Sequence, residues 1–356
     1  MNRTDSIRQV ASTKGVDAVL ISFLPDVRWA CGFTGSNGLL LVLPSTVHFV
    51  TDGRYRTQAC QEIHDAEIDV DVAPGNLYDR ILERGLLEGA DSVLVQADHL
   101  SMAEFESLRV RWPDHSWVAV AGLLAQYVAA KTPDEVEHIQ RAQQLTEQVF
   151  ESILGVIRPG TTEREIAAEI VYRHLKGGAQ SMSFEPIVAS GPNGALPHAR
   201  PTDREIRTGD LVVLDVGCYL DGYASDMTRT IAVGDPGSEA RKVYQTVLEA
   251  QQAALSVARA GIPATDLDGA ARSVIGDAGY GEYFSHSLGH GVGLQVHEWP
   301  RIAQSADYPL PLYAAVTIEP GIYIPREYGV RIEDIVVLQE DGCRNLTSAP
   351  KDLIIL

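Results

Sequence analysis

The stretch Leu211-Val212-Val213-Leu214-Asp215-Val216-Gly217 places one acidic residue inside an otherwise apolar run. A short apolar run bounded by turn residues predicts a strand that is buried on both faces. A buried ionised carboxylate is costly unless it is paired or bound to a metal ion. Asp215 therefore needs a partner, and the neighbouring sequence supplies one.

A returning strand follows directly after this run. The dipeptide Asp221-Gly222 predicts a two-residue hairpin turn. The register of such a hairpin places Asp215 opposite Thr228 and brings Asp226 onto the same face of the sheet. Two carboxylates this close would raise the pKa of one of them sharply unless a cation lies between them. The hairpin is the first indication of a metal site.

A second pair of acids occurs in the same context nearer the C-terminus. The apolar run 315–321 contains Glu319, and the run 330–334 contains Glu333 after a turn expected near Tyr328-Gly329. Taken singly, each acid is well explained as a salt-bridged or strand-end residue. Four acids in similar surroundings are better explained as one functional site.

Histidines lie between the two pairs of acids. The glycine-rich stretch 285–293 contains His286 and His290, and His297 follows it. This stretch lacks the lysine of a P-loop and the strand-turn-helix context of a dinucleotide-binding fingerprint, so we interpret it as close packing around a ligand histidine. His198, in Leu196-Pro197-His198-Ala199, is unremarkable by itself.

The sequence before this region predicts a separate domain. Apolar runs alternate with amphipathic segments from Val16 to about Gln126, a pattern typical of an α/β domain with a mixed sheet. The stretch 131–135 then predicts the capped start of a long helix that opens a second domain. We therefore expect domains at 1–130 and 131–356. The expected strands are Asp17–Ser22, Gly38–Leu43, Val47–Thr51 and Ser92–Gln96, and the expected helices are Arg80–Glu88 and Met102–Trp112.

The second domain contains a weak internal repeat. Arg158-Pro159-Gly160, which should end the long helix, is echoed by Arg259-Ala260-Gly261, and each precedes a helix that ends near glycine. Two related α+β halves facing one another would build one site from both. Chance matching is the alternative explanation.

Composition excludes several classes of partner. The 356 residues carry a net charge of −19, which disfavours binding to nucleic acid and to anionic membranes. The sequence has no apolar run of bilayer length, and its first residues lack the apolar core of a signal peptide. We expect a cytoplasmic protein that binds neither nucleic acid nor membranes.

The motifs resemble those of the pita-bread metallopeptidases, specifically the Xaa-Pro peptidases aminopeptidase P and prolidase. The matching segments are LPHARP, LVVLDVGCYLDGYASDMTRT, SHSLGHGVGLQVHEWP, TIEPGIYIP and GVRIED, in the family's order. The first half is similar to the creatinase-type domain through FTGSNG at Phe33–Gly38 and TDGRYRTQA at Thr51–Ala59. The resemblance implies an α/β N-terminal domain and an α+β pita-bread catalytic domain with a pseudo-twofold repeat.

The resemblance also implies a dinuclear metal site. Asp215 would bind one ion, His290 and Glu319 the other, and Asp226 and Glu333 would bridge the two. Four carboxylates balance the charge of two divalent cations. Oxygen-rich ligation with a single imidazole suits Mn²⁺, with Co²⁺ or Zn²⁺ as alternatives. A hydroxide bridging the metals is the expected nucleophile.

The remaining roles follow from the same resemblance. Glu319 would pass a proton to the leaving proline nitrogen, while His198 and His297 would hydrogen-bond the scissile carbonyl and the developing oxyanion. His286 would line the proline pocket. Arg331 would orient a ligand carboxylate. Arg301 is placed where some prolidases hold the C-terminal carboxylate of a dipeptide, although an ordinary surface arginine is an equal alternative.

We expect an Xaa-Pro aminopeptidase that acts on short proline-containing peptides, because FTGSNG and TDGRY look more like aminopeptidase P. The alternative is an Xaa-Pro dipeptidase, which Arg301 favours. Methionine aminopeptidase usually lacks the first domain, creatinase dispenses with the metal ligands, and a non-catalytic pita-bread binding protein would not need the intact ligand set. By analogy with the family we expect a homodimer.

Overall fold

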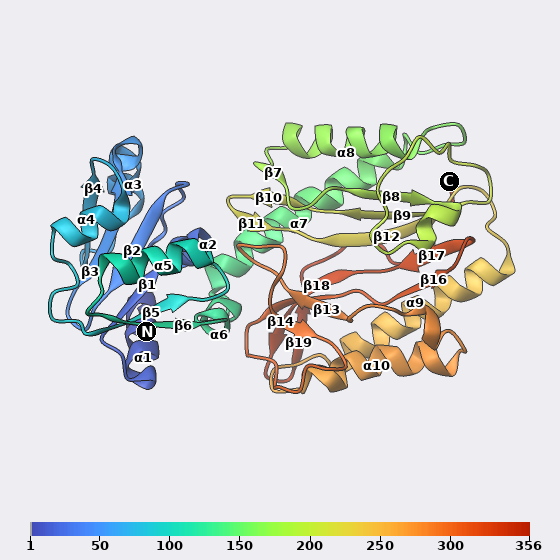
Figure 1. Cartoon of the computed structure of the whole chain (residues 1–356). Helices are drawn as coiled ribbons and strands as arrows, with labels where there is room; N and C mark the ends of the chain where they lie inside the picture. Colours follow the sequence, from blue (N-terminus) through green and yellow to red (C-terminus); the bar gives the residue numbers. More distant parts are fainter. Residues whose placement is uncertain (1) are drawn as a thin grey trace. The chain divides into compact units, whose positions relative to one another are not determined.

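A computed structural model describes residues 2–356, so Met1 lies outside the described residues. The chain forms two compact units, and the division between them falls between Val128 and Ala129. Figure 1 shows the chain coloured along its sequence. Along residues 2–356, no helix is both long and apolar enough to span a membrane.

The first unit is an α/β domain with a mixed sheet, as predicted. Its strands follow the order β4-β3-β2-β1-β5-β6. The pairs β1/β2 and β2/β3 are antiparallel, whereas β3/β4, β1/β5 and β5/β6 are parallel. The elements are α1 Arg3–Lys14, β1 Ala18–Ile21, α2 Leu24–Cys31, β2 Gly38–Val42, β3 Val47–Asp52, α3 Arg56–Glu62, β4 Ile68–Ala73, α4 Leu77–Glu83, β5 Ser92–Gln96, α5 Met102–Arg111, β6 Ser116–Val120 and α6 Ala125–Ala129.

One helix of this unit lies earlier than predicted. The sequence pattern suggested Arg80–Glu88, but α4 begins at Leu77 and ends at Glu83. The side chain of Asn76 accepts hydrogen bonds from the backbone N–H groups of the first turn, which fixes the start of the helix. Apolar periodicity alone did not reveal this cap.

The second unit is α+β, with helices on the two sides of curved sheets. Helices α7 and α8 pack on the strands β8, β9 and β12, while α9 and α10 pack on β15, β17 and β18 (Figure 1). The elements are α7 Pro133–Ile153, α8 Glu163–Lys176, β7 Ser181–Met182, β8 Ile187–Ser190, β9 Leu211–Val216, β10 Cys218–Leu220, β11 Tyr223–Ala224, β12 Met227–Ala232, α9 Ser238–Val257, α10 Ala264–Asp277, β13 Gly289–Gly291, β14 Glu298–Ile302, β15 Ala315–Ile318, β16 Gly321–Ile324, β17 Tyr328–Arg331, β18 Asp334–Gln339 and β19 Gly342–Asn345.

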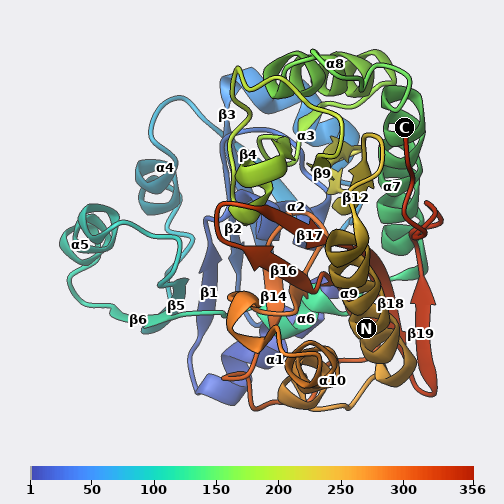
Figure 2. The same ribbon diagram turned by 90° about the vertical axis from the view of Figure 1, so that its right-hand side faces the viewer.

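The predicted repeat appears as two corresponding pairs of helices. Helices α8 and α10 each have 14 residues and follow the two echoed motifs at the spacing expected from the sequence. Figure 2 shows α9 and α10 lying next to each other. Both halves therefore place a helix pair behind strands that carry acids.

The long helix α7 begins as predicted and ends early. Thr132 caps it, and Thr132 and Glu135 exchange the hydrogen bonds of a capping box. The helix stops at Ile153, and a turn replaces the last predicted helical residues before Arg158. A second local difference concerns the turn expected near Tyr328-Gly329, because both residues lie within β17.

Candidate metal centre

The four predicted acids lie in or directly next to strands of the second unit. Asp215 lies within β9, and its register partner is Thr228, as the hairpin predicted. Asp226 directly precedes β12. Glu319 follows β15, and Glu333 directly precedes β18. The acids therefore come from both halves of the second unit.

The second pair of acids faces each other across a gap in pairing. The ladder β15/β18 and the ladder β16/β17 keep one register, so Glu319 and Glu333 lie opposite each other between them. Their backbone N–H groups turn to other segments: Glu319 donates to Leu288 and Glu333 donates to Thr228, at 2.8 and 3.1 Å. The second bond joins the two halves of the unit at the acids.

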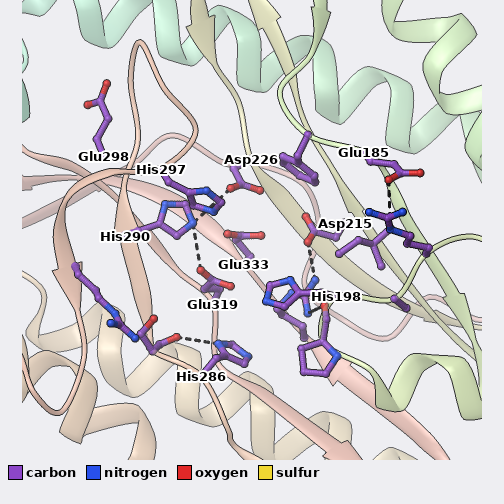
Figure 3. A pocket seen from close by; sticks show the side chains of 18 residues that line it. Glu185, His198, Asp215, Asp226, His286, His290, His297, Glu298, Glu319 and Glu333 are labelled. Carbon is purple, nitrogen blue, oxygen red and sulfur yellow. Dashed lines mark hydrogen bonds and ion pairs between the residues drawn. The ribbon is translucent and has the colours of Figure 1, made fainter. Parts of the chain in front are cut away.

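His290 completes a tight cluster. Ligand atoms of Asp226, His290 and Glu333 all lie within 4.8 Å of one another. His290 Nε2 is 3.4 Å from Glu319 Oε1 and 3.7 Å from Asp226 Oδ2, and Figure 3 shows these side chains pointing toward one another. His290 Nδ1 lies 3.0 Å from the carbonyl oxygen of Gly291. A carbonyl only accepts, so Nδ1 carries the proton and Nε2 offers its lone pair to the cluster.

The pKa shifts and the burial of the cluster favour a bound cation. Burial, and then the neighbouring acids, raise the pKa values of Asp226 and Glu333 well above their ordinary range. Burial raises the pKa of Glu319 to about 8, and burial lowers the pKa of His290 to about 4. Asp215 Oδ1 is buried and has no hydrogen-bond partner within residues 2–356. These donors fit divalent cations, which satisfy ionised carboxylates and neutral imidazole together.

Arg331 provides the positive charge that the chain itself brings to the acids. Its Nη2 donates to Asp215 Oδ2 at 2.6 Å, and its Nε donates to Thr228 Oγ1 at 3.0 Å. The Thr228 hydroxyl in turn donates to Glu333 Oε2 at 2.8 Å. Arg331 therefore contacts Asp215 directly and reaches Glu333 through Thr228. The hairpin register predicted the position of Thr228 but not this bridging role.

His286 is held more tightly than the sequence indicated. Its Nδ1 lies 2.8 Å from the carbonyl oxygen of Ser287, and its Nε2 lies 2.9 Å from the hydroxyl of Tyr323. Arg331 Nη1 donates to the same hydroxyl at 2.7 Å, so Tyr323 donates to His286. Burial lowers the pKa of His286 to about 4. Both ring nitrogens of His286 already have hydrogen-bond partners in the protein. The neutral ring can therefore contact a ligand in the cavity by packing but not by a hydrogen bond.

Every site residue predicted from the sequence lines one cavity of about 610 Å³. These residues are His198, Asp215, Asp226, His286, His290, His297, Arg301, Glu319, Arg331 and Glu333. We call the buried set Asp215, Asp226, Arg331 and Glu333 the floor of the cavity. We call the solvent-exposed set His198, His297 and Arg301 its rim.

Short-range contacts hold the ring of His297 and the backbone of Arg301 at the rim. The ring of His297 meets the ring of His290 edge-on, with centroids 4.4 Å apart. Arg301 lies in β14 at an open edge of its sheet. The hydroxyl of Tyr308 accepts from the backbone N–H of Arg301 at 2.9 Å and donates to its carbonyl oxygen at 2.7 Å. One hydroxyl thus satisfies both polar groups that an edge strand would leave unpaired.

Comparison with known proteins identifies the family. Residues 137–340 match the model of Metallopeptidase family M24, and residues 3–127 match that of the Creatinase/Prolidase N-terminal domain. The chain belongs to metallopeptidase family M24. It is 36% identical over 354 residues to a protein of Pyrococcus horikoshii named Xaa-Pro dipeptidase, and the alignment covers 99% of this chain and 98% of that protein.

Solved structures of the M24 family give the same result. An Xaa-Pro dipeptidase from Bacillus anthracis matches with a TM-score of 0.96 and 37% identity, covering 99% of each chain. An X-Pro aminopeptidase from Thermotoga maritima matches with a TM-score of 0.90 and 36% identity, covering 96% of this chain and 98% of that one. The predicted resemblance and the two-part fold are confirmed, and the chain is a metallopeptidase that works with divalent metal ions.

Proposed function

We propose that this M24 metallopeptidase is an Xaa-Pro dipeptidase. The motifs FTGSNG and TDGRY favoured an aminopeptidase, with a dipeptidase as the alternative. The names of similar proteins favour the alternative, since relatives from Pyrococcus and Lactobacillus are named Xaa-Pro dipeptidase. The observation that carries the proposal is Arg301 on the rim, a cation at the cavity mouth suited to the free carboxylate of a dipeptide.

The roles of the predicted metal ligands and of Arg331 are part of this proposal. Asp215 would hold one metal ion, His290 and Glu319 the second, and Asp226 and Glu333 would bridge them. The bound ions would supply Lewis-acid activation of water and of the scissile carbonyl. The oxygen-rich donor set suits Mn²⁺ best, with Co²⁺ or Zn²⁺ as alternatives. Arg331 would keep Asp215 oriented toward its ion through the bond at 2.6 Å.

The protein residues would then handle protons and orient the substrate. The carboxylate of Glu319 lies in the cluster, 3.4 Å from His290 Nε2. We propose that Glu319 accepts a proton from the attacking water and delivers it to the proline nitrogen as the peptide bond breaks. His198 and His297 would donate hydrogen bonds to the scissile carbonyl oxygen as it gains negative charge. The ring of His286 would form part of the wall against proline.

An Xaa-Pro bond is best recognised by a dedicated pocket. Its nitrogen carries no hydrogen, so an enzyme cannot grip the bond through that N–H group. A cavity shaped for the pyrrolidine ring, with one cation for the terminal carboxylate, gives specificity by other contacts.

We also propose a homodimer in the cytoplasm, and light scattering that gives the mass of a single chain would contradict the dimer.

The proposal is tested by comparing three substrates on Mn²⁺-loaded protein: Ala-Pro, Ala-Pro amide and Ala-Pro-Ala. A dipeptidase should show kcat/KM for Ala-Pro at least 10-fold above that for the other two, because they lack the free carboxylate next to proline. Equal or faster cleavage of Ala-Pro-Ala would favour the aminopeptidase. Absence of turnover on all three with metal bound would contradict both.

A further inference from the structure

A buried ion pair lies in the wall of the cavity, outside the residues assigned above. Lys131 Nζ and Glu298 Oε2 are 2.5 Å apart, and their side chains are only 2% and 7% exposed. Glu298 lines the cavity, but in Figure 3 its carboxylate points away from the acid cluster. Glu298 is therefore placed as part of the wall and not as a further acid of the cluster.

Glu298 closes the loop that connects two site histidines. It follows His297 directly, and its backbone is paired with Gly291, the neighbour of His290. Its other carboxylate oxygen accepts from the backbone N–H of Gln295 at 3.0 Å. The same carboxylate therefore holds both the loop and Lys131, so the position of the loop depends on the lysine.

Lys131 is fixed at its other end to the strand that leads to Glu319. Its backbone N–H donates to the carbonyl oxygen of Tyr313 at 3.0 Å, and Ala130 pairs with Ala314 just before β15. A Cβ atom at Gly293 would lie 2.5 Å from Lys131 Nζ. Lys131 can approach Glu298 because position 293 is glycine and no side chain occupies the space beside the ammonium group.

We propose that Lys131 is a positioning residue for the peptidase reaction, acting through Glu298 to fix the loop that carries His297 beside His290. The pair ties β15, which leads to Glu319, to the hairpin β13–β14. A buried carboxylate that loses its counter-charge must take up a proton or move toward water. Movement of the loop by about 1 Å is enough to lower turnover by about 100-fold when it displaces a group that contacts the reacting atoms.

The test is a double-mutant cycle on metal-loaded protein. Lys131→Met keeps the length of the side chain and removes its charge, and Glu298→Gln removes the partner charge. We expect Lys131→Met to lower kcat on Ala-Pro at least 10-fold, with KM changed less than 3-fold and metal content unchanged. The double variant should be no slower than the slower single variant, because both changes break the same contact. Lys131→Arg should recover at least half of the lost kcat.

Two further variants separate positioning from folding. Gly293→Ala leaves both charges in place but crowds Lys131 Nζ, so it should lower kcat in the same way and more weakly. Arg204→Met breaks a partly buried ion pair with Asp210 in the same unit, away from the cavity lining. It should lower the melting temperature and leave kcat within 2-fold.

Three results would overturn the proposal. The first is a kcat of Lys131→Met within 2-fold of the parent. The second is a double variant whose loss equals the product of the single losses. The third is a loss of kcat that matches the fraction of metal lost or of protein unfolded. If Lys131→Met does not fold, the first and third criteria apply to Glu298→Gln, which breaks the same ion pair.

Discussion

The floor and the rim of the cavity differ in burial and in their expected roles. The floor residues Asp226, Arg331 and Glu333 are 4%, 3% and 2% exposed, and the side chains of Arg331 and Glu333 both hydrogen-bond the hydroxyl of Thr228 in β12. The rim residues His198, His297 and Arg301 are exposed to solvent. Changes at the floor should therefore remove the metal centre as a whole, whereas changes at the rim should alter individual steps or substrates.

The largest effect is expected from the floor. Glu333→Ala should release at least one metal ion and lower turnover by about 1000-fold or more, because the ions would then repel each other without the bridging carboxylate. Elemental analysis of the purified variant measures the loss directly. Two ions retained in Glu333→Ala would contradict the role of Glu333 as a metal ligand and the expected difference between floor and rim.

A rim histidine should affect the reaction and spare the metals. His297→Gln should lower kcat by about 100-fold, the typical cost of losing one donor to a developing oxyanion. Metal content should stay at the level of the parent protein. Loss of metal in this variant would mean that His297 belongs with the floor.

The rim arginine should affect binding more than turnover. Arg301→Met should raise KM for Ala-Pro about 10-fold, since a charge-assisted hydrogen bond is worth about 1.5–3 kcal/mol. KM for Ala-Pro amide should not change, because that substrate has no carboxylate. Arg200→Met is a matched control, since Arg200 is another exposed arginine of the cavity lining. A similar rise in KM for the control would show that only general positive charge matters.

Removing the hydroxyl that holds Arg301 should give a weaker form of the same effect. Tyr308→Phe leaves the backbone N–H and carbonyl of Arg301 without this partner but keeps the ring, which packs 5.3 Å from the ring of Trp299. We expect KM for Ala-Pro to rise about 3-fold, on the order of one weak hydrogen bond. Tyr244→Phe, which loses a hydroxyl bonded to Lys351, should leave KM unchanged.

A buried histidine outside the cavity lining should influence stability and not catalysis. His174 Nδ1 lies 2.9 Å from the carbonyl oxygen of Ile170, and burial lowers the pKa of His174 below its ordinary value of 6.5. The unfolded chain then binds a proton more readily than the folded chain, so stability is lost as pH falls below about 6.5. His174→Gln should reduce this loss in urea unfolding and leave kcat within 2-fold. An unchanged loss between pH 7.5 and 5.5 would contradict this.

Much of the floor was predictable because local rules determine it. A two-residue turn fixes the register of a hairpin, so the sequence correctly placed Asp215 opposite Thr228. The run 315–321 with its single acid likewise identified Glu319 beside the floor, and the run 330–334 identified Glu333. The helix predicted at Arg80–Glu88 lies instead at Leu77–Glu83, because an asparagine cap sets its start. The turn predicted near Tyr328-Gly329 was also wrong, because both residues belong to a strand that begins after the hairpin turn.

The contacts that support the site were not predictable, because they join distant parts of the chain. Lys131 and Glu298 meet across 167 positions. The resemblance implied that Arg331 orients a ligand carboxylate, but it did not identify that carboxylate as Asp215, 116 positions away. A single sequence contains no signal for such pairs. The sequence also could not show that both nitrogens of His286 are occupied, which limits this residue to a packing role.

The most direct test of the metal centre is anomalous X-ray diffraction at the manganese edge from crystals of Mn²⁺-loaded protein. We expect two anomalous peaks, both enclosed by Asp215, Asp226, His290, Glu319 and Glu333. Peaks located elsewhere, or a cluster of these five side chains without any peak, would contradict it.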